Sequence, residues 1–132
     1  MCGIAGFISL NQPIDHPKSH LDSALQKLKN RGPDAHGIYR DENCELGHTR
    51  LSILDTSPAA NQPMISENNR YTIIFNGEIY NYRELRAELE SAGVIFQTQS
   101  DTEVLARGWS QFGRDWLRRL NGMFAFAVWE KD

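Results

Sequence analysis

Short apolar runs alternate along the chain with stretches of helical spacing, and together they predict six strands and three helices. The strongest strand signal is the run Tyr-Thr-Ile-Ile-Phe at 71–75, because β-branched and aromatic side chains favour strands. The run at 46–54 alternates only imperfectly, as expected of a strand that is covered on both faces. The predicted strands are residues 2–10, 38–40, 46–54, 71–75, 94–96 and 123–129.

Three stretches carry apolar side chains three and four residues apart, which is the spacing of one helix face. They are residues 19–29, a stretch that Asn81 begins and Gly93 ends, and residues 102–112. A side-chain oxygen at the start of each can accept a hydrogen bond from the first turn. The predicted capping pairs are Ser19 with Asp22, Asn81 with Glu84, and Ser100 with Glu103.

Strands that are apolar on both faces require helices on both sides, so the pattern predicts a layered domain of mixed strands and helices. The last predicted strand ends within three residues of the C-terminus. An apolar strand left at a sheet edge favours aggregation, so we expect the chain to be part of a longer protein.

Composition narrows the class of protein. The chain has 132 residues, 40% hydrophobic and 23% charged, which is typical of one soluble domain. A net charge of −3 without runs of like charge argues against a nucleic-acid or anionic membrane surface. Neither a membrane span nor a secretory signal is present, so we expect a cytoplasmic location. The four histidines show no metal-binding spacing, so we expect no metal site.

The candidate chemistry begins at the N-terminus, where Cys2 follows Met1 directly. If Met1 is removed, Cys2 carries both a thiol, with an ordinary pKa of about 8.5, and a free α-amine, with one of about 7.7–8.0. A single residue would then contain a nucleophile and its own general base. The alternative is an ordinary cysteine near a chain start.

Six segments together resemble one enzyme family across nearly the whole chain. They are Cys2-Gly3-Ile4-Ala5-Gly6, Arg31-Gly32-Pro33-Asp34, Gly47-His48-Thr49-Arg50-Leu51-Ser52-Ile53-Leu54-Asp55, Phe75-Asn76-Gly77-Glu78-Ile79-Tyr80-Asn81, Ser100-Asp101-Thr102-Glu103 and Leu120-Asn121-Gly122-Met123-Phe124-Ala125-Phe126. The chain resembles the N-terminal glutaminase domain of class II glutamine amidotransferases, the N-terminal-nucleophile type. Within that family it is most similar to glutamine-hydrolysing asparagine synthetases. Amidotransferases for amino sugars or the purine precursor tend to carry Trp-Ala-Thr-His near the arginine instead.

The resemblance implies an α+β fold: a four-layer αββα sandwich of the N-terminal-nucleophile hydrolase type, with two mostly antiparallel sheets. It implies that residues 1–132 are a glutaminase domain truncated on its C-terminal side, with the synthetase domain absent. It implies no cofactor in this domain, since ATP and Mg²⁺ belong to the synthetase domain.

The resemblance also implies a reaction. Glutamine would be hydrolysed to glutamate and ammonia through a γ-glutamyl thioester on Cys2. Ammonia would pass to the synthetase domain, which converts aspartate to asparagine with ATP. The side-chain amide of Asn76 and the backbone N–H of Gly77 would stabilise the oxyanion. The alternative for Asn76-Gly77 is a plain turn after a strand.

Glutamine is a zwitterion, so a paired cation and anion are expected to hold it. By resemblance, Arg50 would bind the α-carboxylate in a two-pronged contact, and Asp101 would bind the α-ammonium. The resemblance adds Leu51, Ser52, Ile53, Leu54 and Glu78 to the pocket. Alternatively, Asp101 is an acid favoured in a first helical turn, and Glu78 is a solvated surface acid.

Two other functions stay open. The chain could be a non-catalytic fragment that serves as a folding or interaction unit. It could also be another amidase of the same nucleophile class, although Arg50 with Asp101 favours a free amino acid as substrate. The oligomeric state is not predicted.

Overall fold

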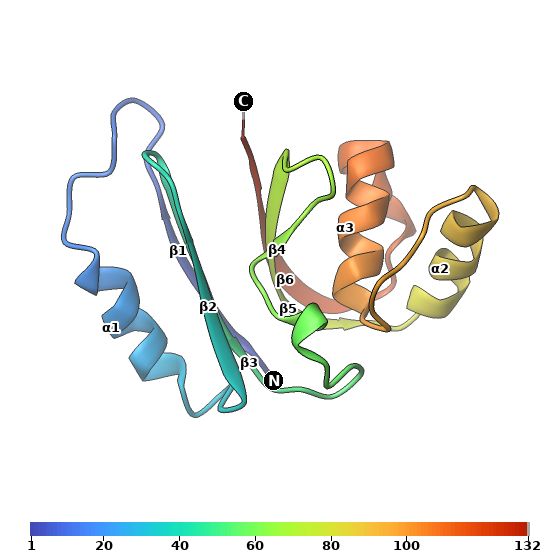
Figure 1. The fold of residues 1–132 in the computed structure, drawn as a ribbon, viewed down its shortest axis with the longest axis horizontal. Helices are drawn as coiled ribbons and strands as arrows, with labels where there is room; N and C mark the ends of the chain where they lie inside the picture. The colour runs from blue at the N-terminus through green and yellow to red at the C-terminus, as the bar shows by residue number, and fades with distance from the viewer. Residues whose placement is uncertain (132) are drawn as a thin grey trace.

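Two three-stranded antiparallel sheets lie face to face, with helices on both outer sides, in the computed structural model, which describes residues 1–131. Figure 1 shows the four layers edge-on. The strands are β1 (Gly3–Ile8), β2 (Ala35–Arg40), β3 (Cys44–Arg50), β4 (Met64–Ile65), β5 (Tyr71–Ile79) and β6 (Gly122–Glu130). The helices are α1 (Ser19–Leu28), α2 (Tyr82–Ser91) and α3 (Asp101–Phe112), with 3₁₀ segments at Pro58–Ala60 and Gly113–Arg119. The predicted αββα sandwich is confirmed.

The first sheet has the order β1-β3-β2, and α1 covers its outer face. Every residue of the central strand β3 is buried, as its imperfect alternation predicted. Gly47 lets α1 approach closely, because a Cβ there would collide with Leu25. Leu21 and Leu25 are the buried residues of α1, and burying a leucine contributes about 1.5–3 kcal/mol.

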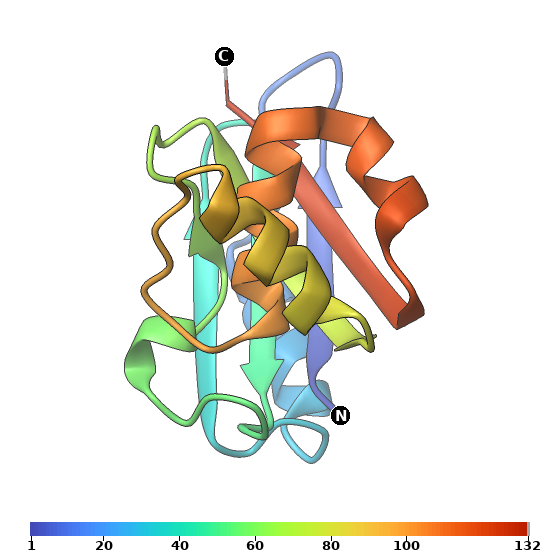
Figure 2. The ribbon, with the colours of Figure 1, turned by 90° about the vertical axis from the view of Figure 1, so that its right-hand side faces the viewer.

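The second sheet has the order β4-β5-β6, and Figure 2 shows α2 and α3 lying across its outer face. The main core lies between this sheet and these helices. Its fully buried members include Ile73, Val104, Leu105 and Trp116. A smaller core fills the space between the two sheets, around Cys44, Leu46 and Ile74.

Strand β5 runs further than predicted and continues through Asn76 and Gly77, so these residues do not form a turn. β6 pairs with β5 over its whole length, with Asn76 opposite Ala125 and Gly77 opposite Phe124. Glycine is required at 77, because a Cβ there would collide with the backbone of Met123 and Phe124.

Among the other strands, three predictions differ from the structure by three residues or more at one end or altogether. β2 begins at Ala35 rather than 38, and β3 ends at Arg50 rather than 54. Residues 94–96 form no strand. The segment lies in the loop after α2, where the backbone N–H of Val94 donates to the Leu89 carbonyl at 3.0 Å and those of Gln97 and Thr98 donate to the Glu103 carboxylate.

Of the three predicted helix caps, one is confirmed and two were wrong. Ser100 accepts a hydrogen bond from the backbone N–H of Glu103 at 3.2 Å, which confirms the predicted cap of α3. The predicted caps of α1 and α2 were wrong, since Lys18 precedes α1 and the Asn81 side chain makes no capping bond. The Asn81 side chain instead joins the backbone of Arg119 and Asn121.

Within residues 1–131, no helix combines the length and apolar character that crossing a bilayer requires.

Candidate active site

A cavity of about 80 Å³ lies where β1 begins and β3 ends, at the end of the sandwich marked by the N-terminus in Figure 1. It is lined by every predicted site residue except one: Cys2, Arg50, Leu51, Ile53, Leu54, Asn76, Gly77, Glu78 and Asp101. The exception is Ser52. Its backbone N–H donates to the Asp34 carboxylate at 2.7 Å, outside the cavity.

Cys2 is half-buried at the start of β1 and is held from two directions. The backbone N–H of Leu51 donates to its Sγ at 3.4 Å, and the Nε of Arg31 donates to its carbonyl at 3.0 Å. Met1 is 64% exposed and also lines the cavity. The thiol therefore faces the cavity beside the end of β3.

Arg50, the last residue of β3, is only 7% exposed. Its Nη1 donates to the Ser57 carbonyl at 2.8 Å and to Oδ1 of Asn61 at 2.7 Å, and its Nη2 donates to the Asp55 carbonyl. A guanidinium has five N–H groups, so two of them have no acceptor among the described residues. This leaves donor capacity for a carboxylate ligand.

Asn76 and Gly77 come from the continuation of β5. The Oδ1 of Asn76 is buried and has no hydrogen-bond partner within residues 1–131. Buried polar atoms of this kind are uncommon and point to a missing partner. Glu78, the next residue, lines the cavity but is exposed to solvent, so the structure fits both interpretations of this acid.

Asp101 is the first residue of α3 and is 6% exposed. Its Oδ2 accepts a hydrogen bond from the backbone N–H of Ile79 at 3.0 Å. Burial raises the pKa of Asp101 above its usual range, and the charge of Glu78 adds to the shift. An acid that is costly to ionise at a helix start is suited to a cationic ligand that would stabilise its charge.

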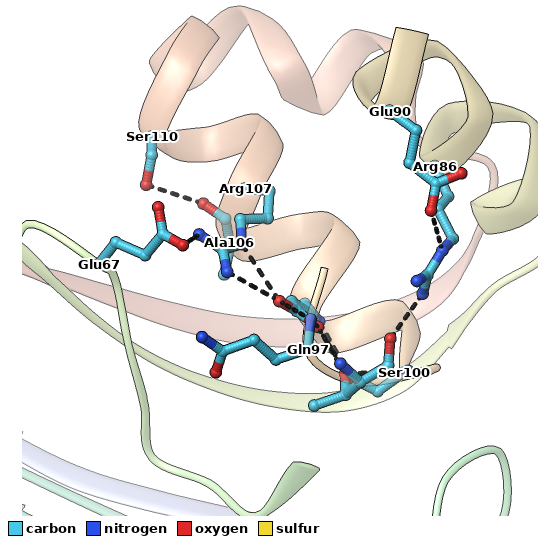
Figure 3. Close-up of polar contacts among 10 residues, drawn as sticks. Glu67, Arg86, Glu90, Gln97, Ser100, Ala106, Arg107 and Ser110 are labelled. Atoms are coloured by element: carbon cyan, nitrogen blue, oxygen red, sulfur yellow. Dashed lines mark hydrogen bonds and ion pairs between the residues drawn. The ribbon is translucent and has the colours of Figure 1, made fainter. Parts of the chain in front are cut away.

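Ion pairs and hydrogen bonds between α3, α2 and neighbouring loops hold the connection before Asp101, and Figure 3 shows these polar contacts. Arg107 pairs with both Glu103 and Glu67. The carboxylate of Glu103 also binds the backbone N–H of Thr98 at 2.7 Å, and Nη1 of Arg86 donates to the Thr98 carbonyl at 2.6 Å. These contacts position the start of α3.

Sequence reasoning missed two residues that shape the cavity, Asp55 and Gln62. Gln62 accepts from the backbone N–H of Phe75 at 2.6 Å and donates to the Thr102 hydroxyl at 3.2 Å. Asp55 accepts from the backbone of Ser57 and Gln99. The only sequence signal was that Asp55 ends the segment that carries Arg50.

Within the described part of the chain, no group of three or more His, Cys, Asp or Glu side chains is placed to hold a metal ion.

Comparison with known proteins places this geometry in a family. The profile of the glutamine amidotransferase domain matches residues 1–132. The chain is 43% identical to asparagine synthetase [glutamine-hydrolyzing] 1 of Bacillus subtilis over 135 residues, which is 100% of this chain and 21% of that protein. It is 38% identical to asparagine synthetase [glutamine-hydrolyzing] 3 of the same organism, covering 99% of this chain and 22% of that protein.

Comparison with solved structures also identifies a glutamine amidotransferase. The glutamine phosphoribosylpyrophosphate amidotransferase of B. subtilis, complexed with ADP and GMP, superimposes with a TM-score of 0.58 at 33% identity, covering 68% of this chain and 22% of that one. The present chain thus spans about a fifth of the length of these relatives. The whole-length profile match and the identity across the chain show that it belongs to the glutamine amidotransferase domain family.

Proposed function

We propose that this domain hydrolyses the side-chain amide of glutamine, with Cys2 as the nucleophile. The observation that carries the proposal is that one cavity gathers Cys2, Arg50, Asn76 with Gly77, and Asp101 from separate parts of the chain. These residues supply the groups that acyl transfer from an amino-acid amide needs: a nucleophile, oxyanion donors, and side chains that bind the α-carboxylate and the α-ammonium.

The reaction has two halves. The Sγ of Cys2 attacks the side-chain carbonyl carbon, and the amide of Asn76 and the N–H of Gly77 stabilise the oxyanion. The α-amine of Cys2 accepts the thiol proton and passes it to the leaving nitrogen, so that ammonia departs and a γ-glutamyl thioester remains. Water then attacks the thioester, which releases glutamate and restores the thiol.

The α-amine of Cys2 is free only after Met1 has been removed. Met1 lies beside Cys2 in the cavity wall, so its removal would both expose the base and enlarge the site. We infer that the processed chain is the active form.

Substrate recognition follows from charge. The two N–H groups that Arg50 has free suit a two-pronged contact with the α-carboxylate. The carboxylate of Asp101 would bind the α-ammonium, with Glu78 adding negative charge. Leu51, Ile53 and Leu54 form the apolar wall, and Asp34 holds the backbone of Ser52 behind it.

We further propose that the ammonia passes to a synthetase-type domain, which uses ATP and Mg²⁺ to convert aspartate to asparagine in the cytoplasm. The support is that the relatives are glutamine-hydrolysing asparagine synthetases, which are about five times longer than this chain. No cofactor is assigned to the present domain.

The test is glutamine hydrolysis by protein whose intact mass shows that Met1 is absent. We expect glutamate and ammonia in equal amounts, and a loss of at least about 10³-fold in rate for Cys2→Ala. Cys44→Ala is the matched control, because Cys44 is fully buried in the small core and does not line the cavity. Equal rates for Cys2→Ala and the parent would exclude Cys2 as the nucleophile, and no hydrolysis by the processed parent would favour a non-catalytic role.

A further inference from the structure

The carboxylate of Asp55 joins the segment that follows Arg50 to the segment that precedes Asp101. Its Oδ1 accepts from the backbone N–H of Ser57 at 2.7 Å, and its Oδ2 accepts from the backbone N–H of Gln99 at 2.7 Å. Ser57 belongs to the loop that follows β3, whereas Gln99 lies two residues before Asp101. One side chain therefore ties together segments that are 44 residues apart in sequence.

On the first side, Asp55 shapes the loop that holds Arg50. The Asp55 and Ser57 carbonyls both accept hydrogen bonds from this guanidinium. The bond from Ser57 N–H to Asp55 Oδ1 closes the turn between those two carbonyls. The direction in which Arg50 presents its remaining donors thus depends on this turn.

On the second side, Asp55 fixes the start of α3. Gln99 is followed directly by the cap Ser100 and by Asp101, so a bond to its backbone N–H restrains the chain just before the acid. The hydrogen bonds from Gln99 and Ser57 also hold the pKa of Asp55 below its usual range, which keeps the carboxylate charged and its bonds strong.

We propose that Asp55 is a positioning residue that sets the spacing between Arg50 and Asp101, and so fits the cavity to the α-carboxylate and α-ammonium of a free amino acid. The inference rests on the proposed function, because it assumes that these two groups hold the glutamine zwitterion. Asp55 does not touch the reacting atoms, so it acts on substrate affinity and on selectivity for the amino-acid end. The chemical step at Cys2 is left intact.

Protection of Cys2 from iodoacetamide by glutamine measures how far bound glutamine and its thioester occupy the site, and it does not require a product to be detected. In Asp55→Asn, which keeps the side-chain shape but loses one acceptor, we expect the half-protecting concentration of glutamine to rise about tenfold. The KM should rise by a similar factor, while kcat changes less than about twofold. The unprotected alkylation rate of Cys2 should stay the same.

A second probe distinguishes a change in the spacing between Arg50 and Asp101 from a general loosening of the cavity. Glutaramic acid is glutamine without its α-amine, so it does not use Asp101. In the parent it should protect more weakly than glutamine, and in Asp55→Asn this difference should shrink to about twofold or less. Asp55→Glu retains the charge and should recover part of the selectivity, and it carries the test if Asp55→Asn does not fold.

Asp41→Asn is the matched control for lost stability. Asp41 also accepts two backbone N–H bonds, from Asn43 at 2.8 Å and Cys44 at 2.7 Å. It lies beyond the opposite end of β3, where Cys44 is already about 20 Å from Arg50 at 3.3 Å per residue. It should lower the melting temperature without changing glutamine protection.

The outcomes separate the two proposals. If glutamine does not protect Cys2 in the parent chain, the proposed function fails and the role of Asp55 fails with it. If glutamine protects the parent and Asp55→Asn equally well, the role of Asp55 alone is overturned. Equal losses of protection in Asp55→Asn and Asp41→Asn would also overturn it, because the effect would then reflect stability.

Discussion

The first sheet carries a cysteine at each end, and the two ends differ in the burial of the cysteine and in the direction in which the pKa of a nearby acid is shifted. Cys2 precedes β1, whose first residue Gly3 lies opposite Thr49, whereas Cys44 begins β3 opposite Ile8. The Cys2 end opens into the cavity, and the Cys44 end is closed. The contrast separates groups arranged for a ligand from groups arranged for stability.

At the Cys44 end, both oxygens of the Asp41 carboxylate accept hydrogen bonds. Asp41 accepts hydrogen bonds from the Tyr39 hydroxyl at 2.8 Å and from Nε1 of Trp129 at 2.6 Å, in addition to two backbone N–H groups. Burial would raise the pKa of Asp41, but these bonds outweigh it and lower the pKa below its usual range. Burial raises the pKa of the Cys44 thiol to about 12.

At the Cys2 end, several polar groups lack a hydrogen-bond partner or are costly to ionise. Asn76 has a buried oxygen without a partner among the described residues, two donors of Arg50 are free there, and the pKa of Asp101 is raised. Each such group costs stability, about 1–3 kcal/mol for a buried unpaired one. Unpaired groups that face a cavity can take up a ligand, whereas the bonds of Asp41 stabilise the fold.

The largest expected difference between the two ends is in thiol reactivity. Treated with iodoacetamide at pH 8, the native chain should take up one adduct, on Cys2, with Cys44 reacting at least about 10³-fold more slowly. At a pKa of about 12 only about 10⁻⁴ of the Cys44 thiol is ionised at pH 8, and its side chain is fully buried. Peptide mass spectrometry measures both sites.

Unfolding in denaturant is the control, since it should make both cysteines reactive. Comparable native rates at Cys2 and Cys44 would show that the closed end opens readily, and the contrast between the ends would be lost.

The next largest effect concerns the oxyanion. Asn76→Ala should lower kcat for glutamine hydrolysis about 10²–10³-fold with a smaller change in KM, because the lost donor acts mainly in the transition state. Steady-state kinetics of ammonia release measure the effect.

Asn81→Ala is the matched control on the same strand-to-helix connection. Its side chain joins Arg119 and Asn121, so its loss should cost about 1–2 kcal/mol of stability and leave kcat unchanged. Equal kcat values for Asn76→Ala and the parent would remove the oxyanion assignment.

Between the two ends, β3 carries His48, which is fully buried and whose ring nitrogens have no hydrogen-bond partner within residues 1–131. Burial lowers the pKa of His48 to about 4, and the charge of Arg50 adds to the shift. The unfolded chain therefore binds this proton near pH 6.5 while the folded chain does not. As pH falls from 6.5 to 4, His48 should lower the free energy of unfolding by about 3 kcal/mol.

Urea unfolding at several pH values measures this slope. His48→Leu removes the titrating group and should flatten the curve by that amount, whereas carboxylates titrate equally in both proteins. Parallel curves for the variant and the parent would show that His48 is paired or solvated in the folded chain.

The sequence predicted the elements better than their ends. The run at 71–75 identified β5, but the strand's extension to Ile79 depends on pairing with β6, which is more than 40 residues later in sequence. The apolar run at 94–96 looked like a strand, yet Glu103 takes the backbone N–H groups that follow it. Local propensity does not reveal which partner a backbone group finds.

The candidate site also contains residues that local sequence predicted and residues that it did not. The site residues predicted from the resemblance all lie within its motifs, and the structure brings all of them but Ser52 to one cavity. Asp55 and Gln62 were missed because they act through side chain to backbone bonds with distant segments. Such bonds leave no periodicity or motif in a single sequence.

The smallest expected effect concerns the charge of Asp101, which burial makes costly beside the cavity. Because burial raises the pKa of Asp101, it should begin to lose its charge at a higher pH than an ordinary aspartate. The half-protecting concentration of glutamine should therefore rise up to about tenfold per pH unit below that pKa. Asp101→Asn should bind weakly at every pH and show no such rise, with Asp22→Asn as the matched control, since Asp22 is exposed on α1 and pairs with Arg40. A raised folded pKa also means that ionised Asp101 costs stability as pH rises through it, so Asp101→Asn should melt at a higher temperature than the parent at pH 7. A variant that lost both affinity and stability would place Asp101 with the paired structural acids, on the Asp41 side of the comparison.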